Sequence, residues 1–184
     1  MTALKLILTA LEPVPKRARS HLQESLRLLD ALVQQIRDLS LDLRPSQLAH
    51  LGLVETLQGH VDRWAHRTGL VIHFAAARLH PRPGQAIATA CFRIVQEALT
   101  NITRHARARQ VWIALRQHDA ALDLRIRDDG KGFDLDAVRA RAGQGLGLLG
   151  IEERVRLIGG QLAIRTAPGK GTEIQVWGPL RHSR

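Results

Sequence analysis

The 184-residue chain is poor in cysteine, in long apolar runs and in aromatic residues, each of which particular classes of protein require. It has one cysteine, Cys91, so no disulfide can form within the chain, and we expect that thiol to be a small buried side chain. No apolar run approaches the roughly 20 residues that a membrane helix needs, and the opening MTALKLILTALEPVP lacks the cationic start and cleavage site of a signal peptide. We therefore expect a cytoplasmic protein with no membrane segment in this chain.

Aromatic residues are also scarce, at 3% of the sequence, and tyrosine is absent. The formal net charge of +10 would otherwise favour a nucleic-acid partner, because clustered arginines bind phosphates. Here the basic residues are spread along the whole chain, and few rings are present on which bases could stack. We therefore expect no nucleic acid among the partners. The hydrophobic content of 45% fits one ordinary folded domain with a short appendage.

Residues 1–46 have the pattern of an incomplete helical hairpin followed by a linker. Apolar side chains recur there at alternating steps of four and three, which is typical of a coiled coil or helix bundle: Leu22, Leu26, Leu29, Val33, Ile36 and Leu43. A shorter apolar stub precedes this helix and stops before Pro13, because proline cannot continue a helix. A helix with such a stripe needs partners, so residues 20–43 could pair two copies of the chain.

Residues 47–184 have the pattern of one α+β domain. Helices are predicted over residues 53–66 and 85–105, and a third follows a glycine-rich loop at 142–147 and ends near Ile158. Alternating apolar residues predict strands at 70–74, 111–115, 122–126, 162–164 and 174–176. Helices and antiparallel strand pairs of this kind predict a two-layer α/β sandwich.

The first candidate site lies on the helix predicted over residues 85–105. Glu97 and Asn101 are four residues apart at the margin of its apolar face, where their oxygens could hold a hydrated Mg²⁺ against phosphates. Arg104 and His105 continue that edge and could bind phosphate oxygens. Taken alone, the same pattern also fits an ordinary helix with a polar border.

Two further candidate sites are turns rich in glycine. Asp128 follows a predicted strand and could accept a hydrogen bond from a base amine, while Gly130 and Gly132 would let a ligand approach closely; the alternative is a plain turn. Residues 145–150, GLGLLG, open a helix and offer its N–H groups to phosphate. They also match the glycine pattern of dinucleotide-binding proteins. The preceding strand and the later acidic residue that this class requires are not found here, so we set that interpretation aside.

In this order, and followed by Gly171 and Thr172, the three motifs resemble the N, G1 and G2 boxes of one ATP-binding fold. Sensor histidine kinases, gyrase-type topoisomerases, Hsp90 chaperones and mismatch-repair ATPases share that fold. The segments RIVQEALTN, RHA and GLGLLGIEERV are most similar to histidine kinases of two-component systems, and among them to the nitrate-sensor type. The resemblance covers essentially the whole chain. It implies an α+β sandwich of the histidine kinase, Hsp90 and gyrase ATP-binding type over residues 47–184, preceded by a truncated dimerisation hairpin.

The resemblance also implies ATP and Mg²⁺ as cofactors and a role for each motif. Asn101 would hold Mg²⁺ between the phosphates, and Glu97 would be the catalytic residue, as in the ATPase branch of the family. Asp128 would bind the adenine amine, and Thr172 would help to fix adenine through water. The ATP-binding residues implied in this way are Asn101, Arg104, His105, Asp128, Gly130, Gly132, Gly145, Leu146, Gly147, Leu148 and Thr172.

The N-terminal segment departs from the subfamily pattern. There the phosphoacceptor histidine precedes a segment similar to TALKL, which is residues 2–6 here, and His21 lacks the residues that flank an acceptor, so we expect the acceptor to be missing from this chain. The implied function is transfer of the ATP γ-phosphate to a histidine-bearing hairpin, in cis in a longer protein or in trans, with a response regulator as the later recipient. One alternative is a non-enzymatic nucleotide-binding module that heterodimerises with full-length kinases. Another is a serine kinase of the anti-sigma type, against which the apolar seam at 22–43 argues.

Overall fold

The structure, a computed structural model, describes residues 45–140 and 146–180, which lie within the second of two compact units of the chain, Pro45–Arg184. The predictions made for residues 1–44, including the seam at 20–43, lie outside the described residues, as does Gly145. The predicted boundary between residues 46 and 47 stays a prediction. Helix α3, Pro45–His50, begins inside the segment that the sequence analysis assigned to the linker.

Five strands form a single sheet in the order β1-β2-β3-β5-β4. The strands are β1 (Val71–Ala76), β2 (Gln110–His118), β3 (Ala121–Asp128), β4 (Gln161–Thr166) and β5 (Thr172–Pro179). All neighbouring pairs are antiparallel except β1 and β2, which are parallel. The sequence analysis did not foresee the parallel pair. Parallel neighbours need a crossover connection, and helix α5 between β1 and β2 supplies it.

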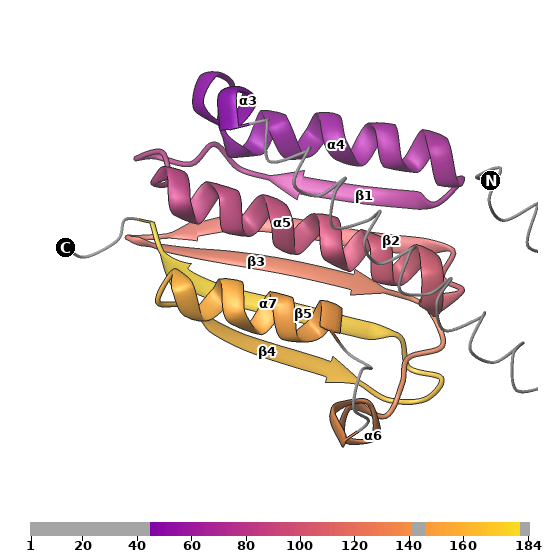
Figure 1. Cartoon of the computed structure of the whole chain (residues 1–184). Helices are drawn as coiled ribbons and strands as arrows, with labels where there is room; N and C mark the ends of the chain where they lie inside the picture. The colour runs from indigo at the N-terminus through magenta and orange to yellow at the C-terminus, as the bar shows by residue number, and fades with distance from the viewer. Residues whose placement is uncertain (1–44, 141–145, 181–184) are drawn as a thin grey trace, which may run out of the picture. The chain divides into compact units, whose positions relative to one another are not determined.

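Three helices cover one face of this sheet (Figure 1): α4 (Leu53–Thr68), α5 (Gln85–Asn101) and α7 (Leu146–Leu157). This arrangement confirms the predicted α+β fold with two layers. Two six-residue helices, α3 and α6 (Leu135–Ala140), were not predicted, because each is too short to display a helical repeat of apolar residues. None of the helices within residues 45–140 and 146–180 combines the length and the apolar character needed to span a membrane.

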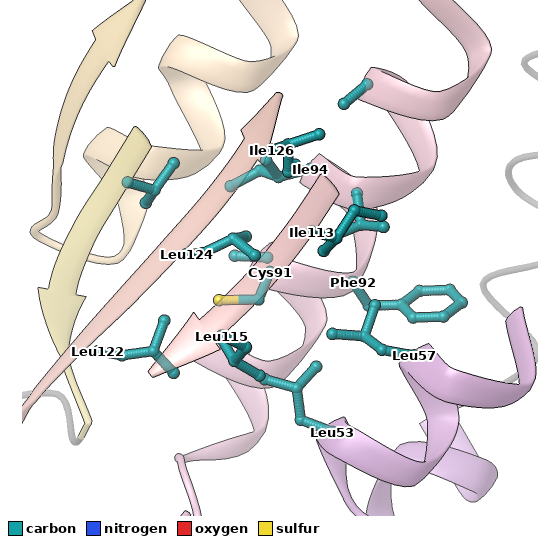
Figure 2. Packing of buried hydrophobic residues seen from close by; sticks show 14 of the residues in the cluster. Leu53, Leu57, Cys91, Phe92, Ile94, Ile113, Leu115, Leu122, Leu124 and Ile126 are labelled. Atoms are coloured by element: carbon teal, nitrogen blue, oxygen red, sulfur yellow. The ribbon is translucent and has the colours of Figure 1, made fainter. Parts of the chain in front are cut away.

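The core lies between the helices and the strands, as Figure 2 shows around Cys91 and Ile94 of α5. Both side chains are fully buried, and they pack in one cluster with alternate residues of β2 and β3, such as Ile113 and Leu124. Leu57 of α4 belongs to the same cluster and is also fully buried. The apolar period of about 3.6 in the helices and of 2 in the strands therefore determines which side of each element faces this core.

The C-terminal end of α5 differs from the prediction of one helix up to His105. The regular helix ends at Asn101, and a π-helical turn, η1, follows over Ile102–Ala106. Arg107 then adopts a left-handed conformation with φ of 54°, and the chain turns into β2. The helical segment therefore extends about as far as predicted, and only the type of its last turn was not foreseen, because sequence periodicity does not separate a π turn from an α-helical one. Such turns are rare and are frequent at functional sites.

Candidate functional site

Helix α5 places Glu97 and Asn101 on one edge, just before the π turn. Both side chains are half-buried, whereas Arg104 and His105 on the π turn are exposed. A carboxylate and an amide one turn apart form a small set of oxygen ligands, and Mg²⁺ in proteins prefers oxygen and keeps several water molecules. The residues present therefore fit the metal that the resemblance implied, with two basic side chains in the following turn.

The first turn of α7 lies directly against this edge of α5. A Cβ atom added to Gly147 would collide with Oε1 of Glu97 and would lie 3.2 Å from Nδ2 of Asn101. The first and third motifs, far apart in the sequence, therefore meet in the structure. Beside Gly147, Leu148 is half-buried, while Leu146 is 69% exposed. The absence of a side chain at Gly147 leaves Glu97 and Asn101 their space.

Asp128, the last residue of β3, is the buried acid of the site. Its side chain is only 3% exposed, and its Oδ1 accepts a hydrogen bond of 2.7 Å from the backbone N–H of Gly130. Burial raises the pKa of the Asp128 carboxyl above its ordinary value, and hydrogen bonds from Gly130 and from the backbone and hydroxyl of Thr172 partly oppose that shift. A buried acceptor of this kind suits a ligand that brings its own N–H donor.

Gly130 connects this second motif to the π turn. A Cβ atom there would lie 2.5 Å from the carbonyl oxygen of Ala106 and 2.7 Å from both Cβ of Ala106 and Oδ1 of Asp128. The next residue, Lys131, donates its backbone N–H to the Ala106 carbonyl oxygen at 2.8 Å. The loop after β3 is therefore fastened to the end of η1, which follows directly on Asn101.

Gly132 has a φ of 57°, and a Cβ atom there would collide with the Ala167 carbonyl oxygen. This position requires glycine for two reasons: the backbone is left-handed, and it lies very close to the turn between β4 and β5. The backbone N–H of Gly169 donates to the Lys131 carbonyl oxygen at 2.6 Å across the same contact. The loop after β3 is held on one side by η1 and on the other by the β4–β5 turn.

Two residues of this region were missed by the sequence analysis. Asp129 accepts hydrogen bonds through Oδ1 from the backbone N–H groups of Arg109 and Gln110, at 2.8 and 2.9 Å. The bond from Gln110 contributes most to lowering the pKa of the Asp129 carboxyl. Thr166 is the second, and its hydroxyl lies 3.3 Å from that of Thr172. The position of Asp129 next to Asp128 could have pointed to it, whereas nothing in the sequence distinguishes Thr166.

Within the described residues, contacts join several members of the predicted set into two parts. Glu97, Asn101, Gly147 and the π turn form one part, and Asp128, Gly130, Gly132 and Thr172 form the other. The Ala106–Lys131 bond joins the two parts. The arrangement offers a buried carboxylate for a hydrogen-bond donor at one end and oxygen ligands for a cation at the other, and two basic residues lie on the turn that follows these ligands.

Comparison with known proteins identifies the family of this domain. The family model described as "Histidine kinase-, DNA gyrase B-, and HSP90-like ATPase" matches residues 86–182, more than half of the chain. An uncharacterized sensor-like histidine kinase of Chloroflexus aurantiacus is 36% identical over 176 residues, covering 92% of this chain and 29% of its own length. The signal transduction histidine-protein kinase/phosphatase DegS of Brevibacillus brevis is 33% identical over 163 residues, covering 89% of this chain and 42% of its own. The chain therefore spans less than half the length of these two relatives.

Solved structures resemble the fold. The histidine kinase domain of the blue-light activated histidine kinase from Erythrobacter litoralis EL346 is similar with a TM-score of 0.60 and 22% identity, over 70% of this chain and 61% of that chain. The histidine kinase AdeS of Acinetobacter baumannii has a TM-score of 0.60 at 14% identity, over 96% of this chain and 91% of that chain. At such identities the likeness concerns the fold alone. Because the family model matches more than half of it, the chain belongs to the histidine kinase-, DNA gyrase B- and HSP90-like ATPases. Its similarity to the two relatives identifies its ATP-binding domain as one of the histidine kinase family.

Proposed function

We propose that this domain binds Mg²⁺-ATP in the site described above and is the catalytic domain of a two-component sensor histidine kinase of the nitrate-sensor type. The observation that carries the proposal is the contact of Gly147 with Glu97 and Asn101, because it unites a helix edge rich in oxygen ligands with the N-terminal turn of α7. Helix N-termini favour phosphate, since their first N–H groups have no partner within the helix.

Each side chain has a proposed role that follows from its place. Asp128 accepts the hydrogen bond of the adenine amine, and the Thr172 hydroxyl beside it helps to fix the base. Asn101 holds Mg²⁺, which would neutralise phosphate charge and orient the γ-phosphate for transfer. Glu97 adjoins the same space and is the proposed catalytic residue. In this proposal, Arg104 and His105 bind phosphate oxygens, and the loop from Gly145 to Leu148 closes over the phosphates.

Calorimetric titration of Mg²⁺-ATP into the wild type and Asn101→Ala tests the binding site. We expect one-site binding by the wild type and a strong loss of affinity in the variant, because phosphate charge would lose its bridging cation. Gln85→Ala is the matched control, since this exposed amide lies at the opposite end of the same helix. A well-folded wild type that does not bind ATP would remove the basis of the proposal.

The proposed reaction transfers the γ-phosphate to a histidine on a dimerisation hairpin, with a response regulator as the later recipient. Incubation with γ-labelled ATP and a full-length kinase whose own ATP site is inactivated tests this step. Acid-labile, alkali-stable label on the partner is the expected result, and this chain alone is expected to take up none. Damping of an active full-length kinase without any transfer would instead favour a non-enzymatic module that heterodimerises with kinases.

A further inference from the structure

The hydroxyl of Thr166, at the end of β4, lies among polar groups from two loops. It accepts a hydrogen bond of 3.1 Å from the backbone N–H of Phe133, in the loop after β3. It donates to the carbonyl oxygen of Gly171 at 3.0 Å, in the turn before β5. The Thr172 hydroxyl lies 3.3 Å away. One side chain therefore joins the two loops that flank Asp128.

The number of protons that each hydroxyl can donate decides which of these groups is the donor and which is the acceptor. A threonine hydroxyl has one proton to donate and can accept through its oxygen. The Gly171 carbonyl is nearer to Thr166 than the Thr172 hydroxyl is, so it is the favoured acceptor of the Thr166 proton. The Thr172 hydroxyl in turn bonds to the Asp128 side chain, and a bond to an ionised carboxylate is stronger than one to a neutral hydroxyl.

Gly171 adds a steric link between Thr166 and the acid. It has a φ of 69°, and a Cβ atom there would collide with the carbonyl oxygen of Asp128 and lie 3.4 Å from the backbone nitrogen of Gly130. The carbonyl to which Thr166 donates therefore belongs to a residue that packs closely on the backbone of Asp128. A shift of this turn would move the Asp128 carboxyl and the Thr172 hydroxyl together.

We propose that Thr166 is a positioning residue for base recognition, holding the Gly171–Thr172 turn and the Phe133 loop so that Asp128 and Thr172 present a fixed pair of polar groups to the adenine. This inference rests on the proposed function. Thr166 itself does not need to touch the nucleotide. Its effect is on the selection of adenine against a base that carries a carbonyl in place of the amine, because the Asp128 carboxylate accepts a hydrogen bond from the first and repels the second.

The test compares the affinities for Mg²⁺-ATP and Mg²⁺-GTP in the wild type, Thr166→Val and Thr166→Ser. Valine keeps the shape and removes the hydroxyl, and serine restores it. We expect the valine variant to bind ATP about fivefold to tenfold more weakly, the equivalent of roughly one hydrogen bond, while its weak GTP binding changes little. Thr89→Val is the control, because its hydroxyl donates to the Gln85 carbonyl in the first turn of α5, at 2.8 Å, away from Asp128.

The ratio of the two affinities separates positioning from a general loss of folded protein, which would weaken ATP and GTP by the same factor. Thr166→Ser should return the ratio to near the wild-type value, and Thr89→Val should leave it unchanged. A valine variant that discriminates like the wild type would overturn the inference while leaving the ATP site intact, and so would a serine variant that fails to restore the ratio. A folded wild type that binds neither nucleotide would overturn the proposed function itself.

Discussion

Replacement of Gly130 by alanine is the sharpest test of how the site is assembled. The added methyl group would lie 2.5 Å from a backbone carbonyl oxygen of Ala106 and 2.7 Å from both a Cβ atom and a carboxylate oxygen. Ordinary van der Waals contact begins near 3.5 Å. Because two of the three atoms belong to the Ala106 backbone and Cβ, no rotation of a flexible side chain can relieve the contact. The loop after β3 and the π turn must move apart.

The energetic consequence follows from that displacement. Forcing an extra methyl group into a packed site costs roughly 1–3 kcal/mol, and alanine returns roughly 0.4–1 kcal/mol through the lower entropy of the unfolded chain. The net expectation is a loss of about 1–2 kcal/mol, or on the order of 5 °C in Tm for a domain of this size. The added methyl group would lie next to the Lys131–Ala106 hydrogen bond of 2.8 Å and next to the Asp128 carboxyl. Because this carboxyl is the proposed adenine acceptor, ATP affinity should fall as well.

Thermal unfolding followed by circular dichroism, with and without Mg²⁺-ATP, measures both effects. Gly59→Ala is the matched control, because Gly59 lies inside α4 and, among the described residues, its Cβ would meet the flexible end of Arg63 alone, at 3.3 Å. Alanine is the better helix former by roughly 1 kcal/mol, so the same substitution should raise Tm there. A Gly130→Ala protein as stable as the wild type would refute the steric reasoning.

Other outcomes follow from buried or hydrogen-bonded acids and from the buried thiol. Burial raises the pKa of the Asp128 carboxyl in the folded state, so ionising this carboxyl lowers the free energy of unfolding. That loss is absent below the ordinary pKa of 3.8 and grows as the pH rises through the folded-state pKa. In urea titrations towards neutral pH, Asp128→Asn should therefore be more stable than the wild type, although it should lose ATP binding. Hydrogen bonds lower the pKa of the Asp129 carboxyl, so the stability that the ionised group contributes is present above pH 3.8 and is lost as the pH falls through the folded-state pKa. In Asp129→Asn, the free energy of unfolding should therefore fall less steeply with acidification than in the wild type. Burial raises the pKa of the Cys91 thiol to about 12, so a thiol reagent should label it only at the rate of global unfolding, and fast labelling of native protein would contradict its burial.

The order of helices and strands could be read from the sequence because each element carries its own apolar period. Val111, Ile113 and Leu115 alternate along β2, and their burial confirms the face that the alternation predicted. Asp119, where the turn between β2 and β3 was predicted, has a φ of 52°. The motifs were equally local, since Asp128 with its glycines and Glu97 with Asn101 each lie within one turn or helix. The sequence therefore determined the elements, and it supplied the motifs on which the proposed site rests.

Only the tertiary structure decided which of these elements meet. The parallel pairing of β1 with β2, the packing of Gly147 on Glu97, and the hydrogen bond from Phe133 to Thr166 each join segments far apart in the chain. An apolar period states which face of an element is buried and says nothing of its neighbour. A threonine at a strand end looks the same in sequence whether its hydroxyl meets water or two loops. The physical reason is that such contacts depend on the packing of several elements at once, after each local preference has already been satisfied.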